Sequence, residues 1–209
     1  MFLHVPSSAI RSLSVLITVV TAIRLEDPFA GFPGTRYQEA YASSNFSGPI
    51  SVTGIDFFIQ AGEGGSLYGG TYQLSLSTIA ANINSLSNTN FNSNLGPDNA
   101  VFDIAALSGA APNTLTFTGG PFSYDPAKGN LLLDIQISDP VAGGSPTGSF
   151  QDGFGSGPPG IVRYQNFSAG TTGQGLVTEF DFTSVPEPGT LAFLGCGSVG
   201  LLIKRYWRK

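Results

Sequence analysis

Alternation of apolar and polar residues, interrupted by glycine and proline, constrains this chain more than any other feature. The alternation is complete over residues 71–77 and over residues 133–138. Three further segments show it less completely: residues 55–60, 115–117 and 176–182. Because successive side chains of a strand point to opposite faces, a period of two predicts half-buried β-strands.

Turn-forming clusters separate these segments. They supply positive φ angles through glycine or a fixed φ through proline, and they lie at residues 62–65, 119–121, 125–130 and 143–146. With weaker strands at residues 100–105 and 161–167, the count reaches seven or eight. The 28 glycines and 14 prolines disfavour long helices. We therefore predict an all-β fold for residues 31–184: an antiparallel β-sandwich, jelly-roll-like, made of two packed sheets.

Two other features complete the expected organisation of this region. A parallel β-solenoid is the alternative architecture, but the sequence holds no repeat of fixed period. The polar segment 82–99, rich in asparagine and serine, is predicted to be a surface loop, since these side chains favour local bonds to the backbone over strand ladders.

Charge is distributed unevenly along the 209 residues, whose net charge is −5. Residues 31–184 hold three cations and eleven anions, a net charge of −8. The last six residues hold four cations and no anion: Lys204, Arg205, Arg208 and Lys209. An acidic region with so few cations lacks the basic surface that binds a phosphate backbone, so we expect no nucleic-acid partner.

An apolar segment without charges, residues 191–203, precedes this basic tail. A helix extended over residues 189–207 rises roughly 28 Å, enough to span the hydrocarbon core when its terminal cations reach toward the headgroups. We predict a single C-terminal transmembrane helix at residues 190–203, with the basic tail as its cytoplasmic anchor. A buried C-terminal core helix is the alternative, but it gives no reason for four neighbouring cations.

A short proline-containing motif precedes the apolar segment: Val185, Pro186, Glu187, Pro188, Gly189 and Thr190. Motif, apolar segment and basic tail together resemble the PEP-CTERM sorting signal of Gram-negative bacteria, over residues 185–209. The resemblance implies export to the periplasm, a transient anchor in the inner membrane, and recognition by an exosortase, a membrane-embedded transpeptidase or protease. It also implies a bacterium that produces exopolysaccharide.

The motif has a physical rationale as well. Two prolines around Glu187 hold the chain extended and outside the following helix, so a protease can read the backbone just above the membrane. A proline-rich juxtamembrane linker is the alternative interpretation.

Three more segments resemble a recurrent layout of one group of PEP-CTERM cargo proteins. They are Arg36-Tyr37-Gln38 with Tyr41, residues 124–134 and residues 175–178. They predict structure, namely a tight turn that leads into a buried strand, and the resemblance implies no catalytic role for them.

The N-terminus carries an apolar stretch at residues 12–21, the length of a signal-peptide core, after Arg11. Small residues permit cleavage after Ala22, and Ala30 is a poorer site. We predict a signal peptide over residues 1–22, or to residue 30 with the second site. A first strand of the domain is the alternative.

Catalytic residue types are scarce. His4 is the only histidine, and Cys196, the only cysteine, lies in the apolar segment. A Ser-His-Asp set, a Cys-His pair, a zinc cluster and a disulfide within the chain are therefore excluded for residues 31–184. A Ser-Lys dyad would need Lys128, which lies in a turn, and a carboxylate pair is unspecific among eleven anions. We expect that the protein is not an enzyme and that it has no catalytic residue, no metal site and no cofactor.

Carbohydrate binding requires exposed aromatic rings, whereas most of the 19 phenylalanines and tyrosines of residues 31–184 fall on predicted inward faces. The exceptions are the candidate carbohydrate contacts: Phe58, Tyr68, Tyr124 and Tyr164. Six aspartates near turns are candidate Ca²⁺ ligands, although no D-x-D-x-D-G loop is present: Asp98, Asp103, Asp125, Asp134, Asp139 and Asp152.

These observations lead to one expected function and one alternative. The first is a non-enzymatic exported surface or extracellular-matrix protein, sorted by an exosortase and associated with exopolysaccharide or biofilm. The alternative is a carbohydrate-binding module that acts on extracellular polysaccharide, with or without the help of Ca²⁺.

Overall fold

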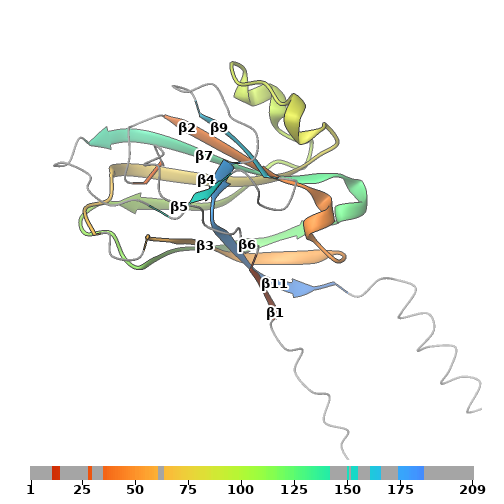
Figure 1. Cartoon of the computed structure of the whole chain (residues 1–209), viewed down its shortest axis with the longest axis horizontal. Coiled ribbons are helices and arrows are strands. Elements are labelled where there is room, and N and C mark those ends of the chain that lie inside the picture. The colour runs from red at the N-terminus through yellow and green to blue at the C-terminus, as the bar shows by residue number, and fades with distance from the viewer. Residues whose placement is uncertain are drawn as a thin grey trace, which may run out of the picture.

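The structure, a computed structural model, describes residues 11–14, 28–29, 35–60, 64–141, 150, 152–154, 161–165 and 174–185. These residues form two β-sheets that lie face to face, one above the other in Figure 1. The predicted transmembrane helix, the basic tail, His4 and Cys196 lie outside the described residues.

The four-stranded sheet has the order β1 (Arg11–Ser14), β11 (Thr178–Ser184), β3 (Ile50–Phe58) and β6 (Thr114–Tyr124). The five-stranded sheet has the order β5 (Ala100–Leu107), β4 (Gly69–Ile79), β7 (Asn130–Val141), β2 (Arg36–Tyr41) and β9 (Ile161–Gln165). A separate pair joins β8 (Asp152–Phe154) to β10 (Gln174–Leu176). All of these pairings are antiparallel.

The chain changes sheet repeatedly, because β1, β3, β6 and β11 lie in one sheet and β2, β4, β5 and β7 in the other. Two antiparallel sheets that pack face to face make a β-sandwich. The predicted antiparallel sandwich is therefore confirmed. The only helices among the described residues are single 3₁₀ turns: η1 (Ser43–Asn45), η2 (Ile83–Ser85), η3 (Phe91–Asn94) and η4 (Pro126–Lys128).

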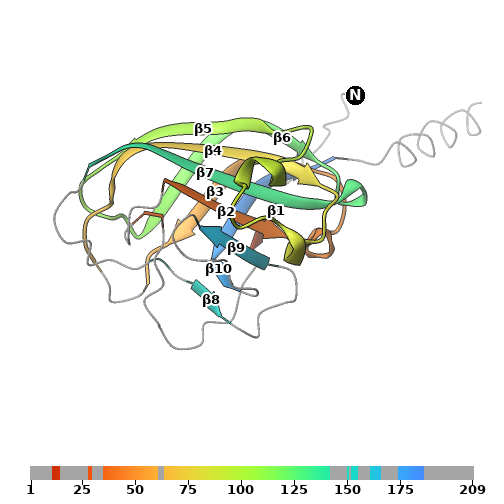
Figure 2. The same ribbon diagram turned by 90° about the horizontal axis from the view of Figure 1, so that it is seen from above.

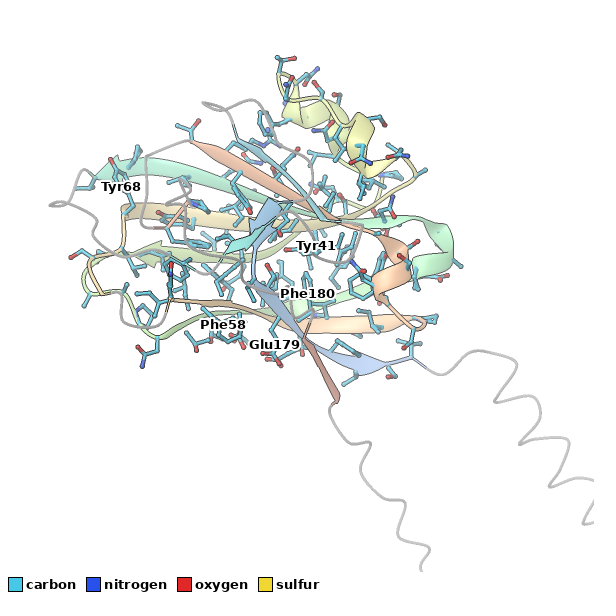
Figure 3. The ribbon with its side chains drawn as sticks, viewed as in Figure 1. Tyr41, Phe58, Tyr68, Glu179 and Phe180 are labelled. Carbon is cyan, nitrogen blue, oxygen red and sulfur yellow. The ribbon has the colours of Figure 1, made fainter. Side chains whose placement is uncertain are left out.

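Inward-facing aromatic and aliphatic side chains fill the space between the sheets. Tyr72, Leu74 and Leu76 of β4 are fully buried, as the alternation of this segment predicts. Tyr41 of β2 meets Phe180 of β11 edge to face at 5.0 Å, and Figure 3 shows both side chains between the layers. Contacts of this kind stabilise the sandwich beyond the area that they bury.

A second, smaller apolar cluster lies on the outer face of the five-stranded sheet. The segment between β4 and β5, which contains η2 and η3, packs over this face, and Figures 1 and 2 show its turns outside the strands. Ile83, Leu86 and Phe91 of the segment contact Ala40 of β2 and Leu132 of β7. The predicted surface loop is thus a cover, because its few apolar residues shield apolar positions of the sheet from water.

The N-terminal strand β1 lies within the segment predicted to be a signal peptide. Arg11–Ser14 pairs with β11 in the register Arg11↔Phe182 to Ser14↔Glu179, so the structure of the whole chain shows the strand that was the alternative. Cleavage after Ala22 stays a prediction; it would remove β1 and leave this edge of β11 open.

Among the described residues, none of the helices is long and apolar enough to cross a membrane.

Candidate functional site

Polar side chains form ordered rows across the outer face of the five-stranded sheet. Gln73 of β4 lies opposite Gln136 of β7, which lies opposite Arg36 of β2. One row further, Ser75 lies opposite Asp134, and Asp134 lies opposite Gln38. Side chains at alternate positions share a face, so five polar groups and one hydroxyl meet on one surface of three adjacent strands.

Asp134 is the centre of this surface. Its side chain is 1% exposed, and its Oδ1 accepts from Nε of Arg36 at 2.7 Å while its Oδ2 accepts from Nη2 at 3.0 Å. The side-chain amide of Gln38 also donates to Oδ1 at 2.9 Å, and that of Gln136 donates to Oδ2 at 2.9 Å. A buried carboxylate with four donors is compensated in charge and in hydrogen bonding, which makes it a structural group.

The covering segment continues the same network. Asn92 of η3 accepts from Nη1 of Arg36 at 2.6 Å, and the guanidinium lies 5.8 Å from the ring centre of Phe91. The amide of Asn94, 5% exposed, donates to Oε1 of Gln38 and to the backbone oxygen of Ser87. The sheet and its cover are thus joined by hydrogen bonds in addition to the apolar cluster.

A cavity of about 390 Å³ opens where the cover ends. Its lining comes from β2, β4, β7 and the residue before β2: Thr35, Arg36, Gln73, Gln136, Ile137 and Ser138. We call it the β2–β7–β4 cavity. Five of its six residues are polar, so the cavity suits a hydrogen-bonding ligand better than an apolar one.

The inward face of β2 carries a second polar group, Glu39, which is fully buried. Its Oε2 accepts from the hydroxyl of Tyr37 at 2.7 Å and from the backbone N–H of Leu176 at 3.3 Å. Burial, and next the negative charge of Glu39, raises the pKa of Tyr41 well above its ordinary value. Tyr41 donates to Oγ1 of Thr178 at 2.8 Å, so this cluster ties β2 to the junction of β10 and β11 and has a structural explanation.

The outer face of the four-stranded sheet is acidic. Glu179 of β11 lies directly opposite Asp56 of β3, and Asp181 lies opposite Gly54. Burial raises the pKa of the Asp181 carboxyl, and the charges of Asp56 and Glu179 raise it further. Among the described residues no group of three metal-binding side chains is placed to hold an ion.

The candidate carbohydrate contacts whose side chains the structure describes, Phe58, Tyr68 and Tyr124, do not form an exposed platform. Tyr124 is 1% exposed, and its hydroxyl donates to the backbone oxygen of Gly129 at 2.7 Å; Tyr68 is 9% exposed. The prediction of exposed rings at these two positions is wrong, because both aromatic bodies pack inside the domain. Phe58 is half-buried and packs against the main core, while the side chain of Tyr164 lies outside what the structure describes. Figure 3 shows Phe58 and Tyr68 on different layers.

The candidate Ca²⁺ ligands whose hydrogen bonds the structure describes each have a different partner. Asp125 accepts from the N–H of Ala127 and begins η4, whereas Asp98 accepts from the N–H of Thr78. Asp103 accepts from the N–H of the next residue, and Asp134 binds Arg36. Asp139 has a positive φ of 52°, and the side chain of Asp152 lies outside the described residues. Lys128 is 75% exposed in its turn, 3.9 Å from Asp125.

The domain ends where the predicted sorting motif begins. The N–H of Val185, directly after β11, donates to the backbone oxygen of Pro49 at 2.9 Å. A small cavity of about 150 Å³ beside it is lined by Val185 together with Pro49, Asp125 and Lys128, among others. Residues 186–209, with the remainder of the motif, lie outside the described residues.

Comparison with known proteins identifies this C-terminal segment. Residues 184–209 match the PEP-CTERM protein-sorting motif, and the predicted motif at 185–190 and the basic tail fall inside the match. The predicted resemblance is confirmed for these residues. The chain therefore carries the sorting signal of exported proteins that an exosortase processes. No curated protein matches the chain.

Sequence reasoning did not find the Arg36–Asp134 network. It treated Asp134 as a candidate ligand near a turn and the segment 82–99 as a solvated loop. Apolar residues within that polar segment, Ile83, Leu86 and Phe91, were the signal that the loop covers a surface.

Proposed function

We propose that this protein is a non-enzymatic surface or extracellular-matrix protein that reaches its location through exosortase processing at residues 185–209. Its β-sandwich then serves the exopolysaccharide layer in which the producing bacterium lives. The observation that carries the proposal is the sorting motif, which begins on the last residues of the folded domain.

The connection between domain and motif is short. Strand β11 ends at Ser184, and Val185 is hydrogen-bonded to Pro49. Gly189 lies four positions after Val185, and an extended chain covers at most about 14 Å over that length. Before processing, the sandwich therefore sits beside the membrane, held by the predicted helix 190–203 and the cytoplasmic anchor, with all strands outside the cell interior.

The hydrogen bonding of the buried polar groups favours a structural role for the domain. The buried carboxylates Glu39 and Asp134 are engaged in hydrogen bonds that join strands. Residues 31–184 contain no histidine and no cysteine, so a catalytic site there would have no imidazole base and no thiol nucleophile. A facing carboxylate pair such as Asp56 and Glu179 is no specific sign of a hydrolase, because residues 31–184 hold eleven acids.

The test is the variant Glu187→Ala. Loss of the central carboxylate of the motif should leave the domain folded but abolish processing, so the full-length chain accumulates in the inner membrane and the surface pool disappears. Cell fractionation with immunoblotting measures both pools. Thr183→Ala, an exposed change just before the motif, is the matched control and should be sorted normally.

An unchanged surface pool in Glu187→Ala would overturn exosortase sorting through this motif. The free energy of unfolding, measured in parallel, separates a sorting defect from a folding defect, and we expect it to stay within about 0.5 kcal/mol of the parent value.

A further inference from the structure

The outer face of the five-stranded sheet changes character from one row of residues to the next. In the row of Ser77, Leu132 and Ala40, the two apolar members belong to the covered cluster. The next row, Ser75, Asp134 and Gln38, is covered but polar, and all three residues are at most 1% exposed. The third row, Gln73, Gln136 and Arg36, is where the cover ends and the β2–β7–β4 cavity opens.

Two side chains of the third row, Arg36 and Gln136, are held in place by hydrogen bonds, and the row as a whole retains hydrogen-bonding capacity. Arg36 is fixed by Asp134 and Asn92, and Gln136 is oriented by its bond to Asp134. The amide of Gln73 makes no hydrogen bond with a described residue, and neither does the hydroxyl of Ser138. The cavity therefore offers the oriented amide of Gln136, the unengaged amide of Gln73, a hydroxyl and the remaining guanidinium N–H groups.

The charge balance of the cavity selects the kind of ligand. The positive charge of Arg36 is already matched by Asp134 at 2.7 Å, and the cavity has no other cationic side chain in its lining. An anion would find no uncompensated charge, and an apolar ligand would leave the amides unpaired. A neutral molecule with many hydroxyl groups satisfies donors and acceptors together.

From this arrangement we propose that the β2–β7–β4 cavity binds a neutral saccharide unit, with Gln73, Gln136 and Ser138 as its hydrogen-bonding residues. This site differs from the aromatic positions considered in the sequence. It deepens the proposed function, since it rests on the protein meeting extracellular polysaccharide, but the binding itself is a property of the purified chain.

The experiment is a nuclear magnetic resonance titration of the full ¹⁵N-labelled chain in a detergent without a sugar headgroup. The side-chain amide signals of Gln73 and Gln136 are followed while maltose, cellobiose, lactose and mannobiose are added one at a time, with inorganic phosphate as the anionic comparison. At least one disaccharide should shift both signals in a saturable way, and phosphate should not. The amide of Gln38, buried under the cover, should stay unchanged.

Variants test the assignment of the site. Gln73→Ala should weaken the binding about fivefold to tenfold, as expected for the loss of one or two hydrogen bonds. Ser138→Ala, at an exposed position, should weaken it less. Gln60→Ala, a glutamine outside the cavity lining, is the matched control and should leave the dissociation constant unchanged.

Three results would overturn the inference: no disaccharide shifts the two amide signals, phosphate alone shifts them, or Gln73→Ala and Ser138→Ala bind as the parent does. Because the titration uses purified protein, it is independent of the Glu187→Ala experiment. Failed sorting with intact binding would refute the proposed function alone, and normal sorting without binding would refute the site alone.

Discussion

The two outer faces of the sandwich are built from the same alternating pattern, but they differ in how their carboxylates are paired. On the five-stranded sheet the residues between β4 and β5 cover the surface, and the carboxylate of Asp134 in β7 is paired with Arg36 and two amides. On the four-stranded sheet the carboxylates of Asp56, Glu179 and Asp181 lie near one another. Strand pairing alone therefore does not decide whether a carboxylate on a sheet face has a counter-charge and hydrogen-bond donors.

The difference shows what a cover requires. A carboxylate that is removed from water must have donors and a counter-charge, and Asp134 has both. The carboxylates of the four-stranded sheet are only partly removed from water, so they tolerate one another at a smaller cost, which salt reduces further. The following predictions are ordered from the largest expected effect to the smallest.

Asp134→Ala should destabilise the domain by about 3 kcal/mol, since it leaves the largely buried Arg36 without a counter-charge and two amides without an acceptor. Denaturant unfolding measures the free energy. On the opposite face, Asp56→Ala removes one of two facing acids and should change stability by less than about 1 kcal/mol, in the stabilising direction. Equal destabilisation by the two variants would contradict the claim that the carboxylate of Asp134 stabilises the domain and that of Asp56 does not.

Asn94→Ala should cost about 1–3 kcal/mol, because this buried amide links the cover to Gln38 and to the backbone of Ser87. Hydrogen exchange of the backbone amides in the segment 82–99 should accelerate in the same variant. Asn92→Ala, at an exposed position of the same turn, is the control and should have a smaller effect on both measurements. If both variants behaved alike, the cover would not depend on its buried amide.

Asp181→Asn should raise stability at neutral pH by a few tenths of a kcal/mol, because it removes a negative charge that burial disfavours and that also lies near Asp56 and Glu179. The folded-state pKa of Asp181 lies above its unfolded value, so the cost of ionising it is present above the folded pKa and disappears as the pH falls toward the unfolded value. The gain in melting temperature should therefore shrink on acidification and on addition of salt. A gain that is independent of pH would contradict the assigned cause.

Much of the fold could be predicted because period-two alternation depends on a local property of strands. The segment 71–77 lies inside β4, and the weak strand predicted from residue 100 is β5. Alternation does not predict strand β2, since Gln38 and Glu39 give it polar residues on both faces. Its polar groups are buried only because distant segments supply their partners.

The sites divide in the same way. The sorting motif could be predicted from sequence because its three parts are contiguous, so the order of residues contains the whole signal. The β2–β7–β4 cavity could not be predicted, because strand pairing brings Arg36 and Gln73 next to Gln136 from more than sixty positions away in the chain. No single segment of the sequence determines the register of these pairings.

The intact mass of the protein recovered from the surface of the producing cells tests the central claim most directly. Processing by an exosortase predicts a mass that lacks the apolar segment and the basic tail, so that the chain ends within or close to residues 185–190. Recovery of only the unprocessed 209-residue chain, with Lys209 still attached, would contradict the account.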